Sequence, residues 1–447
     1  MRHRTRRFAH GLRPRQAGAL GIATAALTAA FYEIGSGRAF GWDASNTVRH
    51  FVATPSLLDP FRSQIGFNNH VLFSGLDHIV FTVFGSQDER LLRVLPIVVA
   101  AAAVGLLTYE VGRRLGAPAG IVAGAVVATN PIAIQEFREV RGYSLLVLFA
   151  VISTQLFVRL RTQQSPSRRL VAAYCLVSGL GVATHLYMVA VLMTQAAIAV
   201  RDLRSLRIWL PRLAAAIVLG VAVAAVPLRQ GLATPNIRTF QPWFPLTVSY
   251  DLLGGEGVAF TFLVPVVLVG LWRLRRNADL HRALATVALV VIGAWLVAPV
   301  LHSRYFLWVL PAVGVLAAAA VARRPVLIAL VVVAVAAQVV TQLPELGEDQ
   351  FPNRAAGALV QRAQDQRQRT CVIGSTGITI AAYAANFREV RTAGQLASCD
   401  LVVAADGRAD QAAVRTAAGL FPYSTTLPAE DPGEAFARSP ALLIPHA

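Results

Sequence analysis

The chain has 447 residues, of which 55% are hydrophobic and 15% charged, and its formal net charge is +17. Soluble domains carry about 25% charged residues, so this composition indicates a membrane protein with several spans and excludes a disordered chain. Three cysteines in 447 residues exclude a disulfide-stapled small domain, a zinc ribbon and an iron–sulfur site.

Eleven apolar runs have the length and composition of membrane spans. An α-helical span needs about 20 mostly apolar residues to cross about 30 Å of hydrocarbon. We predict spans at residues 16–34, 91–111, 117–134, 143–158, 170–184, 186–200, 213–228, 257–272, 283–300, 304–322 and 325–342. The run 69–84 is also apolar, but Asp77 and His78 interrupt it, so a helix lying at the membrane interface is predicted there.

The arginines indicate which loops face the cytoplasm. The chain contains no lysine, so its 41 basic residues are all arginine. With a cytoplasmic N-terminus, 22 arginines fall in the N-terminal tail and the inner loops and ten in the outer loops, which agrees with the positive-inside rule. Ten of the 13 acidic residues before residue 345 fall outside. The positive charge therefore indicates topology in the cell membrane, and we expect no nucleic-acid partner.

The arginines before the first run also resemble the start of a secretory signal, including the pair Arg6 and Arg7. If residues 16–34 were removed, the arginine-rich loops would no longer all fall on the cytoplasmic side of the membrane. We therefore expect this segment to be retained as the first span.

Residues 345–447 differ in composition from the membrane part at 1–344. They hold nine arginines and eleven acidic residues, which gives a net charge of −2. Apolar spacing predicts a helix over 353–366, and the pattern continues with strands at 371–373 and 401–403 and helices near 377–385 and 408–418. This alternation predicts a small α/β domain with a parallel sheet, which the topology places outside the cell membrane.

Cys371 begins the first predicted strand of this domain and Cys399 precedes the second. Adjacent strands of a parallel sheet begin at the same edge and lie about 4.8 Å apart, which is within the reach of a disulfide. Outside the membrane such a bond forms and persists. The alternative is that Cys371 and Cys399 are two small buried side chains that form no bond with each other. Cys175 lies in a predicted span and is expected to stay a free thiol.

The first outer loop, at about residues 35–90, is long and polar, and Asp43 lies in it just after the first span. A carboxylate at the membrane surface is placed to take a proton from an acceptor hydroxyl, beside the phosphate of a lipid-linked substrate. The alternative is that Asp43 caps a helix over 44–54.

His70, Asp77 and His78 lie further along the same loop. Two histidines and an aspartate are residue types that bind divalent metal ions, so a metal cofactor is one interpretation. The other interpretation is that these side chains cap the interfacial helix and hydrogen-bond within it.

The second outer loop carries the densest charged cluster of the membrane part. Glu136, Glu139 and Tyr143 recur at the spacing of one helical face, and Arg138 and Arg141 lie on another. The N-terminus of the span that begins at 143 favours an anion, and arginine makes forked hydrogen bonds to phosphate. We predict that the two arginines bind a phosphate group, with Glu139 and Tyr143 as supporting residues. A closed arginine–glutamate network is the alternative.

Two smaller signals lie at other outer turns. His185 follows the predicted span 170–184, where a lone histidine is more often structural than functional. Arg304 and Tyr305 open the predicted span 304–322, and an arginine at that depth needs an anion partner, either a lipid headgroup or a substrate. We predict Arg304 as a third phosphate ligand, with His70, His185 and Tyr305 as supporting residues.

Several of these residues belong to motifs that follow one another along the chain. They are Trp42-Asp43, Asn68-Asn69-His70, Arg90 to Pro96, Asn130-Pro131 with Phe137 to Tyr143, and Thr184-His185-Leu186-Tyr187 followed by Arg304-Tyr305. Their order resembles the GT-C superfamily of integral-membrane glycosyltransferases, and more closely the bacterial members of glycosyltransferase family 39, the protein O-mannosyltransferase-like group. The resemblance covers about residues 1–345, and the tail resembles the small outer domain that many bacterial members carry.

The resemblance implies a polyprenyl-phosphate-linked sugar donor, carrying mannose or a similar sugar, and inverting transfer to an acceptor outside the membrane, either a protein or a glycan or lipid. The family's acid after the first span acts as the base, which is Asp43 here. Many relatives have an acidic pair at that point, whereas this chain has Asp43-Ala44. The family often has His-Pro-Pro where this chain has Asn69-His70-Val71.

Two other functions are compatible with the pattern. The first is a transporter or flippase of lipid-linked sugars, but such proteins usually carry charged residues at the bilayer midplane, whereas these spans are nearly free of charge. The second is a catalytically inactive relative whose tail binds a partner. The clustering of polar residues on one predicted side favours single-sided chemistry.

Overall fold

The computed structural model describes most of the membrane part and the framework of the tail. The described residues are 11–63, 69–233, 241–255, 257–297, 302–322, 324, 326–346, 353–373, 380, 387–390, 393–396, 398–404, 417–418, 420–427 and 433–437. The chain divides into two compact units. The first contains residues 1–34, 61–74 and 94–344, and the second contains 35–60, 75–93 and 345–447.

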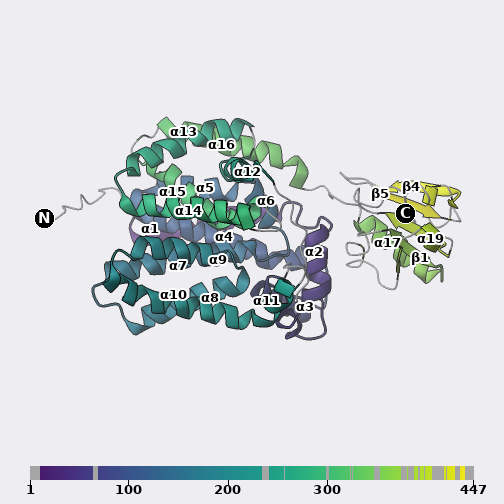
Figure 1. The fold of residues 1–447 in the computed structure, drawn as a ribbon. Helices are drawn as coiled ribbons and strands as arrows, with labels where there is room; N and C mark the ends of the chain where they lie inside the picture. Colours follow the sequence, from purple (N-terminus) through teal and green to yellow (C-terminus); the bar gives the residue numbers. More distant parts are fainter. Residues whose placement is uncertain are drawn as a thin grey trace. The chain divides into compact units, whose positions relative to one another are not determined.

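Helices form nearly all of the first unit, and each of the eleven predicted spans falls on one or two of them (Figure 1). They are α1 (Pro14–Glu33), α4 (Glu89–Leu115), α5 (Ala117–Ala128), α6 (Pro131–Glu136), α7 (Tyr143–Thr162), α8 (Arg168–Thr184), α9 (Met188–Ala199), α10 (Leu203–Val223), α11 (Ala225–Ala233), α12 (Phe244–Leu252), α13 (Gly257–Leu274), α14 (Ala278–Val297), the 3-10 helix η3 (Ser303–Val309), α15 (Leu310–Val321) and α16 (Val326–Gln342).

Six helical segments among the described residues are long and apolar enough to cross a membrane, judged by length and composition. They are α4, α7, α10, α13, α14 and the continuous segment Ser303–Val321, while α5, α9 and α16 are apolar but shorter. Within the bundle α8 packs against α7 and α10, and α15 packs against α5 and α13. The chain is therefore a multi-pass membrane protein, and the total of eleven spans stays a prediction.

The predicted span 117–134 is divided in two by its own sequence. Helix α5 ends at Ala128, and α6 begins at Pro131, which has no N–H to donate to the preceding turn. The side chain of Asn130 caps α6 by accepting hydrogen bonds from the backbone N–H groups of Ile132 and Ala133, at 3.1 and 3.3 Å. The same asparagine donates to the carbonyl of Asp251 at 2.9 Å, so this break also ties the loop before α7 to the end of α12.

The run predicted to lie at the interface forms α3 (Val71–Phe84), whose 14 residues are too few to cross the bilayer. In the first outer loop, α2 (Trp42–Thr47) continues as a π-helical turn (Val48–Val52), and a 3-10 turn follows at Asp59–Phe61. Gly41 occupies the N-cap position of α2, so the alternative that Asp43 caps this helix is wrong.

A buried arginine holds the start of this loop together. The side chain of Arg93 is fully buried and donates hydrogen bonds to the carbonyls of Ser36, Arg38 and Ala39. Its guanidinium also lies 5.1 Å from the centre of the Phe40 ring. One side chain near the beginning of α4 thus contacts residues 36, 38, 39 and 40 of the segment that leads to Asp43.

The tail forms a mixed five-stranded sheet in the order β2-β1-β3-β5-β4. Its elements are α17 (Asn353–Asp365), β1 (Thr370–Ile373), β2 (Arg388–Val390), α19 (Ala393–Leu396), β3 (Leu401–Ala404), β4 (Tyr423–Leu427) and β5 (Gly433–Ala437). Helix α17 packs on β1 and β3 through Ala356, Leu359, Val360 and Ala363, the residues whose spacing predicted it.

The two strands predicted from the sequence pair in parallel, as expected, but the sheet as a whole is mixed. β1 pairs in parallel with β2 and β3, but β5 runs antiparallel to both β3 and β4. β4 and β5 are near in sequence and pair with each other, and their polar residues carry no apolar run that would have marked them as strands. The predicted helices near 377–385 and 408–418 lie largely outside the described residues.

Cys371 in β1 and Cys399, just before β3, form a disulfide with their Cα atoms 5.9 Å apart. The parallel pairing of β1 with β3 brings the two positions together. Both side chains are buried in the layer that contains Val402 and Phe421. Cys175 in α8 is a free thiol, and its Sγ lies 3.5 Å from the carbonyl of Arg212.

We expect the disulfide to be present in the exported protein. Peptide mapping by mass spectrometry without reduction should recover Cys371 and Cys399 as one linked peptide and Cys175 as a free thiol. Reduction should destabilise the tail domain by roughly 3 kcal/mol, because the loop that the bond closes gains conformational entropy in the unfolded chain. Recovery of a free Cys371 from normally exported protein would contradict the pairing.

A second prediction concerns the close approach of α13 and α15. A Cβ atom on Gly270 would lie 2.1 Å from the carbonyl oxygen of Leu316, whereas a Cβ on Gly293 in α14 would meet nothing within 4 Å. Gly270→Ala should therefore destabilise the bundle by about 1–3 kcal/mol through overpacking. Gly293→Ala should leave the melting temperature unchanged or raise it, because alanine favours the helix by about 1 kcal/mol. Equal melting temperatures for the two variants would show that this contact is unimportant.

Candidate functional site

Charged, histidine and tyrosine side chains from four separate segments meet in the first unit. The segments are the residue before α3, the turn between α6 and α7, the turn between α8 and α9, and the 3-10 helix η3. We call this group the basic–aromatic cluster, and its members are His70, Arg141, Tyr143, His185, Tyr187, Arg304 and Tyr305.

The turn between α6 and α7 places two members of the cluster. Helix α6 ends at Glu136, the N–H of Arg141 bonds the carbonyl of Glu139 at 2.7 Å, and α7 begins after Gly142. A Cβ atom on Gly142 would lie 2.9 Å from the Cβ of His70, so glycine allows this turn to approach His70. The predicted continuous helical face through 136, 139 and 143 is therefore wrong, because the chain turns between them.

His70 and Arg141 form the centre of the cluster. Both side chains are almost fully buried, at 4% and 3% exposure. The His70 Nε2 atom accepts from the Arg141 guanidinium, with its Nε at 3.3 Å and its Nη2 at 3.1 Å. The ring of His70 also lies 5.1 Å from the Tyr143 ring and 4.9 Å from the His185 ring. Acceptance at Nε2 assigns the proton of a neutral His70 to Nδ1.

Both histidines are neutral in this setting. Burial, followed by the charge of Arg141, holds the pKa of His70 well below its usual range. Loss of contact with water, together with Arg141 and Arg304, lowers the pKa of His185 to about 3. The Nδ1 atom of His185 accepts from the N–H of Tyr187 at 3.2 Å, which leaves Nε2 as its protonated donor. The positive charge of the cluster therefore comes from the arginines alone.

Tyr143 has a buried hydroxyl that makes no hydrogen bond with any described residue. Its ring lies 5.3 Å from the His185 ring, and the Arg141 guanidinium lies 5.2 Å from its centre. Buried tyrosine hydroxyls usually find a partner, so this one is a donor that a ligand in the cluster would satisfy.

Arg304 enters the cluster from η3. It pairs with Glu136 at 3.3 Å, and the two side chains are 21% and 5% exposed. Tyr305 stacks on Tyr187 with ring centres 5.3 Å apart, and its ring lies 6.1 Å from that of His185. The arginine–glutamate network that the sequence left as an alternative is thus present in part, but its arginine is Arg304, from a segment 168 residues away.

The structure does not support the predicted role of Arg138 as a phosphate ligand. Its side chain is fully buried and donates to the carbonyls of Tyr32, at 3.1 Å, and Ile34. These carbonyls lie at the C-terminal end of α1, where backbone acceptors have no intrahelical donor. Arg138 therefore closes the end of α1, whereas Arg141 is a member of the cluster.

Asp43 and Glu139 are not among the residues that define the cluster. Asp43 belongs to the second compact unit, where it is partly exposed in the first turn of α2. Glu139 is partly exposed in the turn before α7. Tyr187, which the sequence placed in a motif but not among the site residues, joins the cluster by stacking on Tyr305.

No group of three or more potential metal ligands occurs among the described histidine, cysteine, aspartate and glutamate residues. His78 instead bonds within the protein, with Nδ1 2.8 Å from the carbonyl of Val52 and Nε2 3.2 Å from the Thr82 hydroxyl. Asp77 is fully buried, and burial raises the pKa of its carboxyl well above the usual range. Neither carboxyl oxygen of Asp77 has a hydrogen-bond partner among the described residues, so the hydrogen-bonding interpretation fits His78 but not Asp77.

Comparison with known proteins finds a family that matches part of the chain. Residues 73–227 match the family described as dolichyl-phosphate-mannose-protein mannosyltransferase. No curated protein matches the chain at a significant level.

Solved structures match over nearly the whole chain. ArnT from Cupriavidus metallidurans, in the apo state, is 12% identical with a TM-score of 0.63, and the match covers 96% of this chain and 99% of that one. The same protein bound to undecaprenyl phosphate matches with a TM-score of 0.62, 12% identity and the same coverage. An oligosaccharyltransferase from Archaeoglobus fulgidus matches with a TM-score of 0.50 and 14% identity, over 86% of this chain and 67% of that one.

These matches confirm the fold that the sequence resemblance implied: the chain shares the fold of ArnT and of the oligosaccharyltransferase.

Variants at Arg138 and Arg169 test whether Arg138 stabilises the fold at the end of α1. Arg138→Gln should lower the melting temperature by several degrees, because it leaves buried carbonyls unpaired at a cost of about 1–3 kcal/mol. Arg169→Gln, at an exposed arginine in the first turn of α8, should change it by less than about one degree. An Arg138→Gln protein with wild-type stability but weakened binding of a lipid phosphate would restore the original prediction.

Proposed function

We propose that this protein is a membrane glycosyltransferase that transfers a sugar from a polyprenyl-phosphate carrier to an acceptor at the outer face of the membrane. The observation that carries the proposal is the GT-C fold over 96% of the chain, together with a buried basic–aromatic cluster in that fold. The family match at 73–227 supports a sugar carried on a lipid phosphate, with mannose or a similar hexose as the first candidate.

The cluster suits the phosphate of such a donor. Arg141 and Arg304 supply the charge, and arginine binds phosphate oxygens through two parallel hydrogen bonds. The neutral histidines and the Tyr143 hydroxyl supply uncharged donors around them. Glu136 holds Arg304 in place, and its charge is already neutralised by that arginine. The structure of ArnT with undecaprenyl phosphate supports a lipid phosphate as the ligand of this fold.

The proposed reaction needs a base and a stabilised leaving group. Asp43 takes the proton of the acceptor hydroxyl while that oxygen attacks the anomeric carbon of the donor sugar. The bond between this carbon and the phosphate oxygen breaks, and the electron pair leaves with the polyprenyl phosphate. Attack on the face opposite the leaving group inverts the anomeric centre. Arg141 and Arg304 then stabilise the negative charge that develops on the departing phosphate.

The proposed topology places the N-terminus in the cytoplasm and the tail domain outside. The arginine distribution supports this orientation. The disulfide of the tail supports it independently, because such bonds persist in oxidising compartments. The acceptor, whether protein, glycan or lipid, would then reach Asp43 from the same side as the tail.

The experiment begins with membranes that contain the protein and a panel of radiolabelled polyprenyl-phosphate sugars. Release of polyprenyl phosphate together with transfer of label identifies the donor. Asp43→Asn should reduce the transfer rate by about 10²–10⁴, the contribution of a general base. Asp88→Asn is the matched control, because it removes the same charge from the same loop and asparagine still accepts the hydrogen bonds of Arg90 and Leu91.

Transfer by folded, inserted Asp43→Asn at the wild-type rate would refute the assignment of the base. Movement of intact donor across the membrane without release of polyprenyl phosphate would identify a flippase instead. The absence of both activities with every sugar in the panel would favour an inactive relative.

A further inference from the structure

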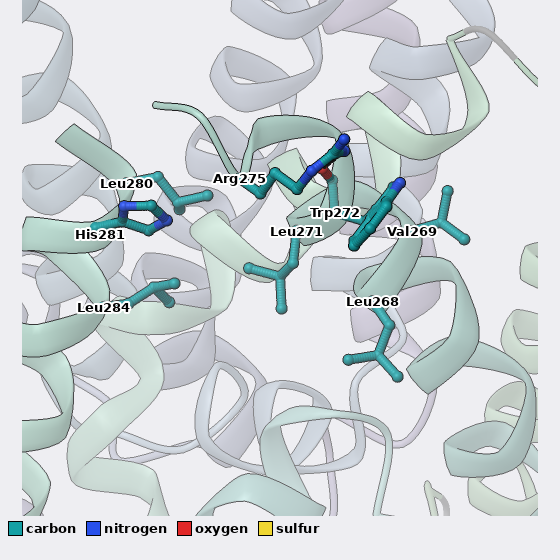
Figure 2. Close-up of a pocket in the computed structure, with 8 residues that line it drawn as sticks. All are labelled: Leu268, Val269, Leu271, Trp272, Arg275, Leu280, His281 and Leu284. Atoms are coloured by element: carbon teal, nitrogen blue, oxygen red, sulfur yellow. Dashed lines mark hydrogen bonds between the residues drawn. The ribbon is translucent and has the colours of Figure 1, made fainter. Parts of the chain in front are cut away.

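An apolar groove lies between α13 and α14. Its volume is about 580 Å³, and it is open on one side. Figure 2 shows its two walls, with Leu268, Leu271 and Trp272 on α13 and Leu284 on α14. A volume of this size accommodates a lipid acyl chain or a drug-sized molecule.

The walls of this groove face the lipid phase. Leu268 is 57% exposed, Trp272 66% and Leu284 41%. Both helices are long and apolar enough to cross a membrane, and only 6% of the apolar window of α14 is buried inside the protein. In a bilayer these leucines contact lipid hydrocarbon. An acyl chain lying along the groove would provide that contact.

One end of the groove is basic. Arg275, just after α13, lies with its guanidinium 3.8 Å from the centre of the Trp272 ring and donates to the Trp272 carbonyl at 2.7 Å. His281 lines the same end from α14 (Figure 2). An arginine has five N–H donors, and the single hydrogen bond found for Arg275 among the described residues occupies one. The guanidinium is thus held in position while most of its donors remain for an anion.

The neighbouring charges leave this end positive. Asp279, the acidic residue of the turn, is paired with Arg161 at 2.9 Å and Arg201 at 3.0 Å. The Asp279 carboxylate is therefore already neutralised, and it would repel an anion next to Arg275 only weakly. Positive charge above an apolar groove matches an anionic headgroup above an acyl chain.

The groove lies at the opposite end of the bundle from the basic–aromatic cluster. Arg273, at the end of α13, donates to the carbonyls of Ala319 and Ala320, near the C-terminal end of α15. Arg304 lies 16 residues earlier in the same continuous helical segment, a separation of about 25 Å at the helical rise. One lipid phosphate cannot contact both Arg275 and Arg304, so the groove is separate from the proposed donor site.

We propose that this groove binds an anionic glycerophospholipid of the bilayer. The acyl chain lies along Leu268, Leu271 and Leu284, and the phosphate is bound by Arg275 and the ring of His281. In the predicted topology this lipid belongs to the cytoplasmic leaflet, whose anionic headgroups attract basic residues at the membrane surface. The site does not depend on the proposed glycosyltransferase activity.

The test uses the full-length protein, purified and delipidated in mild detergent. Native mass spectrometry follows the binding of phosphatidylglycerol and of phosphatidylcholine with the same acyl chains. The wild-type protein should prefer phosphatidylglycerol. Arg275→Gln should weaken its binding about fivefold, whereas Arg275→Lys, which keeps the charge, should retain most of it.

Arg276→Gln is the matched control, because it removes the same charge from the neighbouring exposed residue, which does not line the groove. It should change the affinity by less than about twofold. Equal weakening by Arg275→Gln and Arg276→Gln would overturn the proposal, since general surface charge would then explain the binding. Equal affinity of the wild type for the two phospholipids would also overturn it. Displacement of bound phosphatidylglycerol by one equivalent of undecaprenyl phosphate would assign the groove to an isoprenoid lipid and refute the phospholipid site.

Discussion

A buried guanidinium in an apolar protein must be surrounded by hydrogen-bond acceptors, because its desolvation is otherwise prohibitive. Arg93 and Arg138 are both fully buried, and each donates hydrogen bonds to backbone carbonyls. Arg93 bonds the carbonyls of residues 36, 38 and 39, and Arg138 bonds those of residues 32 and 34. The segment that leaves α1 and leads to Asp43 is therefore held by two buried arginines.

Arg141 and Arg304 have different partners. Arg141 contacts the edge of a neutral histidine and the face of Tyr143, and Arg304 contacts Glu136. The neutral imidazole of His70 accepts a hydrogen bond from Arg141 without cancelling its positive charge. These arginines thus differ in their partners, although their side chains are chemically identical.

Positioning of the cluster depends on small residues and helix breaks around it. The break at Pro131, capped by Asn130, ends the apolar run early and allows the chain to turn before α7. Gly142 then lets this turn lie against His70. The tight contact at Gly270 does the same for α13 and α15, whose opposite ends carry Arg275 and Arg304. Each break costs some helical hydrogen bonding, and the result is a group of polar side chains held by rigid helix ends.

The sequence by itself determined where the helices of the membrane part lie, because a lipid-soluble helix must be apolar over most of its length and this requirement is local. It also marked most of the residues that form the basic–aromatic cluster, and the Cys371 and Cys399 pair could be proposed from strand spacing alone. Only the tertiary structure decided which arginine of the second outer loop belongs to the cluster. Arg138 and Arg141 are three residues apart and chemically identical, but the partners of Arg138 lie 104 and 106 residues away, in backbone carbonyls at the end of α1. Every residue has such a carbonyl, so no side-chain pattern marks these acceptors, and their positions exist only once the helices have packed.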